Sequence, residues 1–235
     1  MSKFKFIGVI GIIMLLFVSV GYGQTRFQAG CNFTLGFPQG DFKNNVDRIG
    51  LGFSGHFLYN LHQSPISAGV SLGFLIYGSE TREEPFSTTI PEIMVDVTTR
   101  NNIFMCHFLL RFQPIEGKLQ PYFDGLFGFN YLWTETGIYN QGSNYEIASN
   151  VIFDDWTLSY GAGGGLMIQV YEKSQNKTKS LFALYIDLGA RYLKGGKAEY
   201  LREGSIIREN GDIVYEINSS ATDLITAHIG ITVTF

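Results

Sequence analysis

The sequence predicts an all-β protein, an eight-stranded antiparallel up-and-down β-barrel that crosses a membrane, and three observations carry this prediction. Apolar side chains alternate with small or polar ones at a period of two in segment after segment. The segments are about ten residues long, the length that a tilted strand needs to cross a bilayer. Charged residues make up only 16% of the chain, against roughly 25% in ordinary soluble domains. A surface that faces lipid explains this deficit of charge.

Residues 1–23 are predicted to be a signal peptide, followed by one barrel domain over residues 24–235. Lys3 and Lys5 precede an apolar run over residues 6–20, and small residues follow at Gly21 and Gly23. The alternative is a membrane anchor, but the run is short for the roughly 20 residues that a helix needs to span a bilayer. Loss of both lysines leaves 15 basic against 21 acidic residues, a net charge of −6. This charge gives no indication of a nucleic-acid partner.

The alternation predicts eight strands, of which the last is the most regular. From residue 225 to 235, six apolar side chains alternate with five small or polar ones. The predicted strands cover residues 27–37, 51–59, 66–76, 104–112, 122–133, 156–170, 182–192 and 225–235. A soluble sandwich has the same alternation, but its polar face favours Lys, Glu and Thr. Here the polar faces are rich in Gly and Ser, as the narrow interior of a small barrel requires. Closure is required because an open edge leaves unpaired backbone groups in lipid.

The connections alternate between short and long, as expected of a barrel with short periplasmic turns and long extracellular loops. Short connections fall at residues 61–64, 114–118 and 172–180, and long ones at residues 38–48, 79–99, 134–154 and 194–222. The last long loop contains Asn210-Gly211, a dipeptide suited to a two-residue hairpin turn. We therefore expect a β-ribbon there, with a disordered polar loop as the alternative.

Three stretches stand out: Gln120-Pro121-Tyr122, Asp187 to Tyr192, and Gly195 to Leu201. They resemble the outer-membrane β-barrel domain of Bacteroidota, which includes PorT-like proteins, and the small OmpA- and OmpX-type barrels. The resemblance covers the mature chain and implies the fold and a place in the bacterial cell outer membrane. The last strand, with Ile229, Ile231, Val233 and Phe235, resembles the signal read by the barrel assembly machinery. It implies that machinery, outer-membrane lipid and lipopolysaccharide as partners. No motif marks the chain as a PorT-like secretion component.

The inward faces carry ionisable residues that we expect to form a polar network in the lumen. They are His56, His107, Arg111, Asp124, Asp187, Arg191 and His228. Counting from the short turns places His107 nearly opposite Asp124, and Asp187 at a similar depth to His228. The main interpretation is structural, because unpaired charges in so narrow a space are costly. A proton or ion path is the alternative.

The same residues argue against catalysis and against a metal or cofactor. His56, His107 and His228 are predicted to point inward, so the long loops lack a base for a nucleophile. No close His and Cys spacing suggests a metal site. Cys31 and Cys106 fall on strands that are not neighbours, so no disulfide is expected between them. We expect no enzyme and no cofactor.

The sequence suggests two functions, which differ in whether the long loops or the barrel interior carries the activity. Apolar residues lie among the acidic ones in the loops, and they either contact a protein partner or cap the mouth of the barrel. The main hypothesis is a structural or interaction protein that acts through its extracellular loops. The alternative is transport of small solutes or hydrophobic molecules, suggested by Gly161, Gly163, Gly164 and Gly165, whose missing side chains would leave a cavity. A protein-secretion component or a lipid-modifying hydrolase is favoured less.

Overall fold

The structure of the protein, a computed structural model, describes residues 27–61, 64–87, 90–115, 117–140, 145–174, 181–209 and 212–235. The predicted signal peptide lies outside these residues. The strands of the barrel are β1 (Phe27–Pro38), β2 (Gly50–Asn60), β3 (Ile66–Ser87), β4 (Ile90–Phe112), β5 (Leu119–Asn140), β6 (Glu146–Ser174), β7 (Leu181–Gly195) and β12 (Leu224–Thr234). The remaining elements are α2 (Gly40–Asn45), β8 (Lys197–Tyr200), β9 (Ile206–Glu209), β10 (Asp212–Tyr215) and β11 (Asn218–Ala221).

The eight long strands form a closed barrel in the order β1-β12-β7-β6-β5-β4-β3-β2. Every neighbouring pair is antiparallel, including the seam where β1 meets β12 with Gln28 opposite Thr234 and Pro38 opposite Leu224. Closure leaves no free edge within the barrel wall, because each strand has a partner on both sides. The predicted fold class is confirmed.

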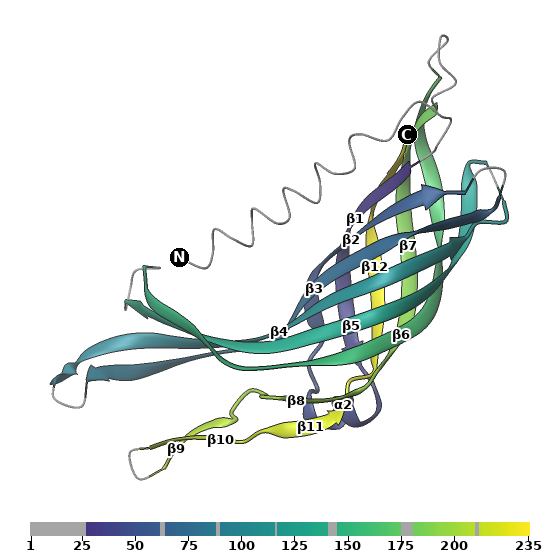
Figure 1. The fold of residues 1–235 in the computed structure, drawn as a ribbon. Helices are drawn as coiled ribbons and strands as arrows, with labels where there is room; N and C mark the ends of the chain where they lie inside the picture. Colours follow the sequence, from purple (N-terminus) through teal and green to yellow (C-terminus); the bar gives the residue numbers. More distant parts are fainter. Residues whose placement is uncertain are drawn as a thin grey trace.

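The two ends of the barrel differ, as the lengths of the connections predicted (Figure 1). One end, which we call the terminal end, contains both ends of the barrel sequence. There the backbones of Phe27 and Phe235 exchange two hydrogen bonds of 2.6 and 2.9 Å. The short connections β2–β3, β4–β5 and β6–β7 lie at this end. The remaining connections between barrel strands lie at the opposite end, which we call the loop end.

Two of the expected long loops are paired strands instead. Strands β3, β4, β5 and β6 have 22, 23, 22 and 29 residues, against 12 in β1 and 11 in β2. β3 pairs with β4 as far as Ser87 and Ile90, and β5 pairs with β6 as far as Tyr139 and Glu146. Pairing of Val95 with Asn140 joins the two hairpins into one sheet, the projecting sheet, which continues past the barrel in Figure 1. The loop prediction was wrong, because strand pairing satisfies the backbone hydrogen-bonding groups of these segments beyond the barrel wall.

The last connection crosses the loop end and contains the predicted hairpin. β9 pairs with β10, with Asp212 opposite Glu209, and residues 210–211 between them lie outside the described residues. β8 pairs with β11 closer to the barrel, with Tyr200 opposite Asn218. A ribbon of two short strand pairs therefore runs out below the projecting sheet in Figure 1.

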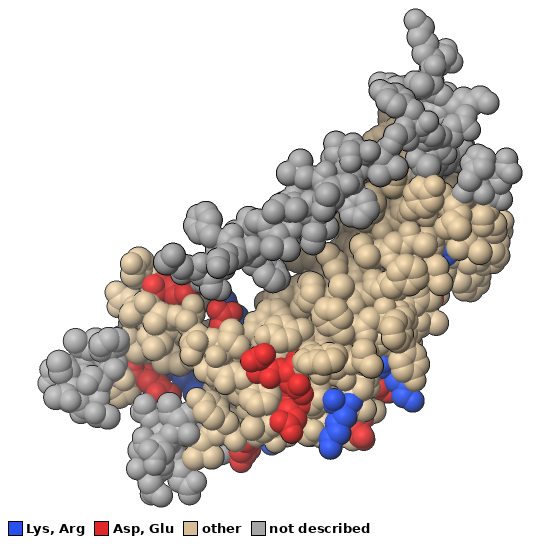
Figure 2. Space-filling view, in the orientation of Figure 1, with Lys and Arg blue, Asp and Glu red and all other residues tan. Residues whose placement is uncertain are grey.

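Large apolar side chains cover the outside of the barrel. Phe53, Phe123, Phe127 and Trp156 are each more than 60% exposed. Figure 2 shows that charged side chains gather toward the loop end, while the visible barrel wall is almost uncharged. Such an apolar belt is far larger than a soluble monomer tolerates, and it is what lipid requires. None of the helices among the described residues is long and apolar enough to span a membrane.

Candidate functional site: a filled lumen and a capped mouth

The centre of the lumen contains a buried carboxylate between two guanidinium groups. Alternation on β4, β5 and β7 turns Arg111, Asp124 and Arg191 inward, and Arg111 lies directly opposite Asp124. Arg111 donates from Nε and Nη2 to the two oxygens of Asp124 at 2.8 and 3.0 Å. Arg191 donates from Nε and Nη2 to Asp124 Oδ2 at 3.1 and 2.8 Å. Both arginines are thus held by charge-assisted bonds, the strongest kind in a protein.

A second carboxylate, Asp187, accepts hydrogen bonds from two hydroxyl groups. Tyr122 donates to Asp187 Oδ1 at 2.7 Å, and Thr232 donates to Oδ2 at 3.1 Å. His228 Nε2 lies 3.1 Å from the Tyr122 hydroxyl and 3.8 Å from Asp187 Oδ1. Asp187 and His228 therefore do lie at a similar depth on neighbouring strands.

Arg111 links the two carboxylates into one network. Its Nη1 lies 4.0 Å from Asp187 Oδ2, and its guanidinium carbon lies 3.8 Å from the centre of the Tyr122 ring. Arg111, Asp124 and Asp187 have fully buried side chains. Two positive and two negative groups balance within this network. Because each charge is paired, burial costs far less than it would for isolated ions.

The structure places the other two predicted histidines less centrally. His107 is opposite Gly128 rather than near Asp124, so the predicted pairing of His107 with Asp124 is wrong. The turn between β4 and β5 sets a different register from the one expected. Arg111, rather than His107, therefore lies opposite Asp124. His56 is buried, and its Nε2 lies 3.4 Å from the hydroxyl of Thr232, which connects it to the network.

Sequence reasoning missed the uncharged members of the network. Tyr122 and Thr232 bond to Asp187, and Ser71 accepts a bond of 3.1 Å from Arg191. All three alternate inward on their strands, so the inward-facing pattern was a usable signal. Neutral hydroxyl groups carry no charge that needs a partner, so charge balance alone does not single them out.

Luminal glycines make room for these large side chains. A Cβ atom at Gly163 would lie 2.6 Å from Cγ of Arg191, and one at Gly189 would lie 2.5 Å from the hydroxyl of Tyr122. A Cβ at Gly165 would also collide with Tyr122. The expected cavity beside the glycines of β6 is therefore wrong, because neighbouring side chains occupy that space. Small and large residues alternate in small barrels for this reason.

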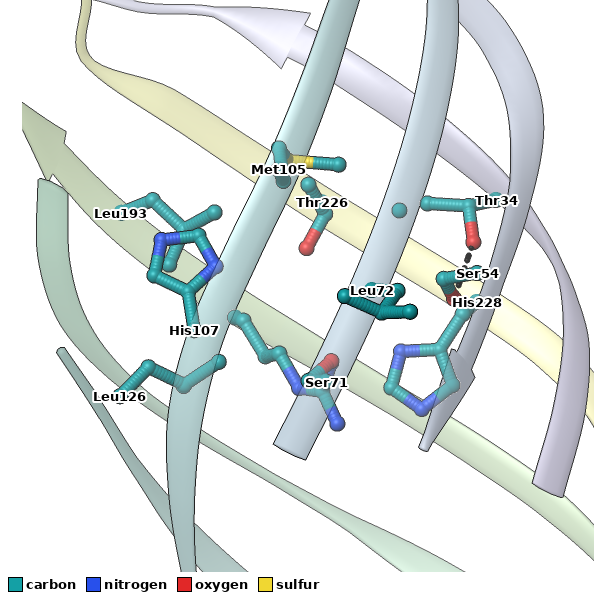
Figure 3. A pocket seen from close by; sticks show the side chains of 12 residues that line it. Thr34, Ser54, Ser71, Leu72, Met105, His107, Leu126, Leu193, Thr226 and His228 are labelled. Atoms are coloured by element: carbon teal, nitrogen blue, oxygen red, sulfur yellow. Dashed lines mark hydrogen bonds between the residues drawn. The ribbon is translucent and has the colours of Figure 1, made fainter. Parts of the chain in front are cut away.

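A small cavity lies in the lumen, on the loop side of the network (Figure 3). It has a volume of about 20 Å³, and its lining includes His107, Met105, Leu126 and Thr226. The hydroxyls of Thr34 and Ser54 hydrogen-bond at 2.7 Å in its wall, as Figure 3 shows. A cavity of this size holds about one water molecule. It is not a channel.

The loop end is closed by a second, apolar layer. Phe42 of α2 is fully buried and contacts the rings of Tyr77 and Tyr200 edge-on, at centroid distances of 5.8 and 5.1 Å. Burial raises the pKa of Tyr77 far above its ordinary value, so its hydroxyl remains a neutral donor to the Leu201 carbonyl at 3.3 Å. An apolar side chain of the first loop thus caps the mouth.

The last strand has the expected alternation of faces. Ile229, Ile231 and Phe235 are about half exposed on the outside of the barrel, and Thr232 is buried inside. Cys31 on β1 and Cys106 on β4 are free thiols. Among the described residues, no group of three or more His, Cys, Asp or Glu side chains is placed to hold a metal ion.

An apolar exterior around a charged, packed interior defines this chain as a transmembrane β-barrel. No family model and no curated protein sequence matches it. Among the solved structures that are similar to it, at low identity, are three barrels. Ail, the attachment invasion locus protein of Yersinia pestis, in complex with the heparin analogue sucrose octasulfate, is 13% identical, with 90% of this chain and 97% of Ail covered and a TM-score of 0.35.

Two further similar structures are outer-membrane or surface proteins by name. Neisserial surface protein A is 10% identical, with 92% of this chain and 98% of that protein covered and a TM-score of 0.35. A major outer membrane protein from Thermus thermophilus is 11% identical, with 91% and 100% covered and a TM-score of 0.39. These scores are too low to transfer a function, so the function is argued from the geometry of this chain.

Proposed function

We propose that this protein is exported to the bacterial outer membrane and has a structural or interaction role there through the parts that project from its loop end. The filled lumen is the observation that carries the proposal. A barrel whose interior is occupied by a buried charge network and a cavity of about 20 Å³ has no path for a solute. The activity is therefore assigned to the outside.

The location is supported by the N-terminal residues and by the last strand. Lys3, Lys5 and the apolar run over residues 6–20 have the pattern of a signal peptide. Phe235 with Ile229, Ile231 and Val233 has the pattern recognised by the barrel assembly machinery. We place the loop end outside the cell and the terminal end in the periplasm, since short turns are periplasmic in bacterial barrels. Outer-membrane lipid and lipopolysaccharide are then the partners of the apolar belt.

The stretches Gln120 to Tyr122, Asp187 to Tyr192 and Gly195 to Leu201 support assignment to the Bacteroidota outer-membrane barrel domain, the domain of the PorT-like proteins. The luminal network has a structural role in this proposal, because its charges are paired with one another. A proton or ion path would need a continuous chain of water or titratable groups along the lumen.

The projecting sheet and the ribbon carry exposed apolar side chains suited to a protein partner. Tyr145, Ile147 and Val151 on or beside β6 are 73%, 45% and 44% exposed. Tyr215 and Ile217 on or beside β10 are 43% and 51% exposed. Exposed apolar residues of this kind, in parts that stand clear of the membrane, are typical of interaction surfaces.

Labelling of single cysteines tests the placement. In a chain with Cys31 and Cys106 replaced by serine, V151C at the loop end and I115C at the terminal end are compared in intact cells. A maleimide polymer too large to cross the outer membrane should label V151C at once and I115C only after the membrane is opened. Equal labelling of both positions in intact cells would rule out the proposed orientation.

A trimmed chain tests where the role lies. Residues 80–97 and 137–150 are replaced by short turns, which shortens the projecting sheet and leaves the barrel strands intact. In a strain without the gene, the full chain should restore whatever envelope or binding defect appears, and the trimmed chain should not. Full restoration by the trimmed chain would exclude the projecting sheet. Restoration by a chain that also lacks residues 206–215 would assign the role to the barrel, and transport would then be the better proposal.

A further inference from the structure

A polar cleft of about 420 Å³ lies at the loop end, beside α2 and the segment that follows β8. Its lining includes Asn44, Asn45, Tyr77, Asn101 and Glu203. The volume falls in the range of roughly 300–1,000 Å³ that small-molecule sites occupy. The lining differs from that of most such sites because polar groups predominate.

The cleft does not continue into the barrel. Tyr77, which lines it, packs in one apolar cluster with Phe42 and Tyr200 and with the luminal residues Leu75 and Leu193. All five side chains are almost completely buried. A molecule in the cleft therefore rests on this seal, so the cleft is a binding site rather than the entrance to a pore.

The charges that line the cleft balance and are already paired in part. Asp47 and Glu203 oppose Arg48 and Arg202. Arg48 Nη2 lies 2.9 Å from Glu203 Oε2, and Arg202 Nη2 lies 4.0 Å from Oε2 of Glu216. Since both cations already face a carboxylate, the cleft has no excess charge to attract an anion or a cation. A neutral ligand fits it best.

Amide groups supply the remaining polar atoms, and the fold holds them in place. Asn45 donates from Nδ2 to the Tyr200 hydroxyl at 3.0 Å, which leaves its Oδ1 as an acceptor. Asn101 is 1% exposed and accepts a bond of 2.8 Å at Oδ1 from Thr134, which leaves its Nδ2 as a donor. An amide presents donors and acceptors together, so it matches a hydroxyl group, which also does both.

Gly78 keeps the cleft open at this point. It lies where the pairing of β3 with β4 shifts register, after Ile76. A Cβ atom at this position would lie 2.8 Å from Asn101 Nδ2 and 3.3 Å from Cγ of Glu203. A glycine here leaves room for both of these lining side chains.

From these observations we propose that the cleft binds a small neutral polyhydroxyl compound, a sugar. The chemistry fits a free saccharide outside the cell and equally the uncharged sugars of a lipopolysaccharide headgroup. Fixed amides, a carboxylate at Asp47 and balanced charges complement hydroxyl groups, and the volume accommodates one or two sugar rings.

The test uses the full mature chain folded in detergent micelles. Glucose, galactose, N-acetylglucosamine and lactose are tested by saturation-transfer NMR and calorimetry, and lipopolysaccharide is tested in a separate arm. Inorganic phosphate and glycine betaine serve as charged and zwitterionic probes. The variants are N101L, G78A and N44A, with N150A on the exposed part of β6 as the matched control.

We expect at least one neutral sugar or lipopolysaccharide to bind, and N101L and G78A to weaken that binding about tenfold, as loss of one or two hydrogen bonds does. N44A lies on the exposed rim, so it tests the site even if N101L fails to fold, and it should weaken binding several-fold. N150A should bind as the unchanged chain does. Binding only of lipopolysaccharide, with the same dependence on the variants, identifies the headgroup as the source.

Three results would overturn the proposal. The first is no binding of any sugar or of lipopolysaccharide by the folded chain. The second is binding of phosphate or glycine betaine in preference to the sugars. The third is sugar binding that N101L, G78A and N44A leave unchanged.

Discussion

Strands β3 to β6 pass through two environments, and the difference between their barrel part and their projecting part shows what each environment selects. Within the barrel, one face of β5 is apolar and exposed at Phe123 and Phe127, and the other is polar and buried at Asp124. Beyond the barrel, on β6, Ala148 and Asn150 are exposed and Ser149 between them is only half-buried. Pairing continues through both parts, but strict alternation of burial ends with the barrel.

Aromatic residues mark the change from one environment to the other. Tyr131 and Trp133 stack with ring centres 5.3 Å apart on β5, and the Tyr131 hydroxyl donates to Asp154 Oδ2 of β6 at 3.0 Å. Amphipathic rings favour the membrane interface because one part prefers lipid and the other prefers water. The same backbone pairing thus supports a membrane wall on one side of these rings and an aqueous sheet on the other.

Removal of the central carboxylate should have the largest effect. D124A leaves Arg111 and Arg191 buried together without the group that both contact. We expect a loss of about 3–5 kcal/mol in the free energy of unfolding, measured by urea titration in lipid vesicles. D154A, at an exposed carboxylate of β6, should cost about 1 kcal/mol or less. Similar losses in the two variants would contradict the paired lumen.

A charge on the apolar belt should cost somewhat less. Phe127 is 62% exposed at the middle of β5, so F127R places a guanidinium in lipid. We expect a loss of about 2–4 kcal/mol in the same titration. V151R, on the projecting sheet, should be near neutral because water surrounds that position. If F127R were as stable as V151R, the belt would not be in lipid.

Removal of one luminal hydroxyl should have an intermediate effect. Y122F deletes the donor to Asp187 and the contact with His228 Nε2 but keeps the ring under Arg111. The expected loss is about 1–3 kcal/mol, because a buried acceptor loses its partner. Y160F, on the exposed face of β6, is the matched control and should change little.

The smallest effect is expected at the exposed ion pair of the cap. Arg48 is 64% exposed and pairs with Glu203 at 2.9 Å. R48A should lower the free energy of unfolding by about 0.2–1 kcal/mol at low salt, and less at high salt. An effect as large as that of D124A would mean that the cap, rather than the lumen, holds the barrel together.

Much of the barrel could be predicted from the sequence because alternation reports which face of a strand meets lipid. The projecting sheet could not, since its side chains do not follow the barrel's alternation of burial: the four successive residues 145–148 are all exposed. The charged members of the luminal network followed from the inward positions, whereas the pairing of Arg111 with Asp124 depended on the register at the β4–β5 turn. The number of residues in that turn does not by itself determine the register.

The cap shows a second limit of sequence reasoning. Phe42 lies in a polar segment, and nothing near it in sequence indicates that it packs against Tyr77 and Tyr200. Tyr200 is far along the chain, and only closure of the barrel brings the two together. Contacts between loops are therefore the part of the fold that is hardest to predict from one sequence.

The barrel spans the membrane, and its own side chains close the lumen. Single-channel recording of the folded mature chain in a planar lipid bilayer tests this closure. We expect insertion, verified by heat-modifiable migration on a gel, without stable conductance steps. Reproducible unitary steps from the inserted chain would contradict it, because they require an open path where the Arg111–Asp124–Arg191 network lies.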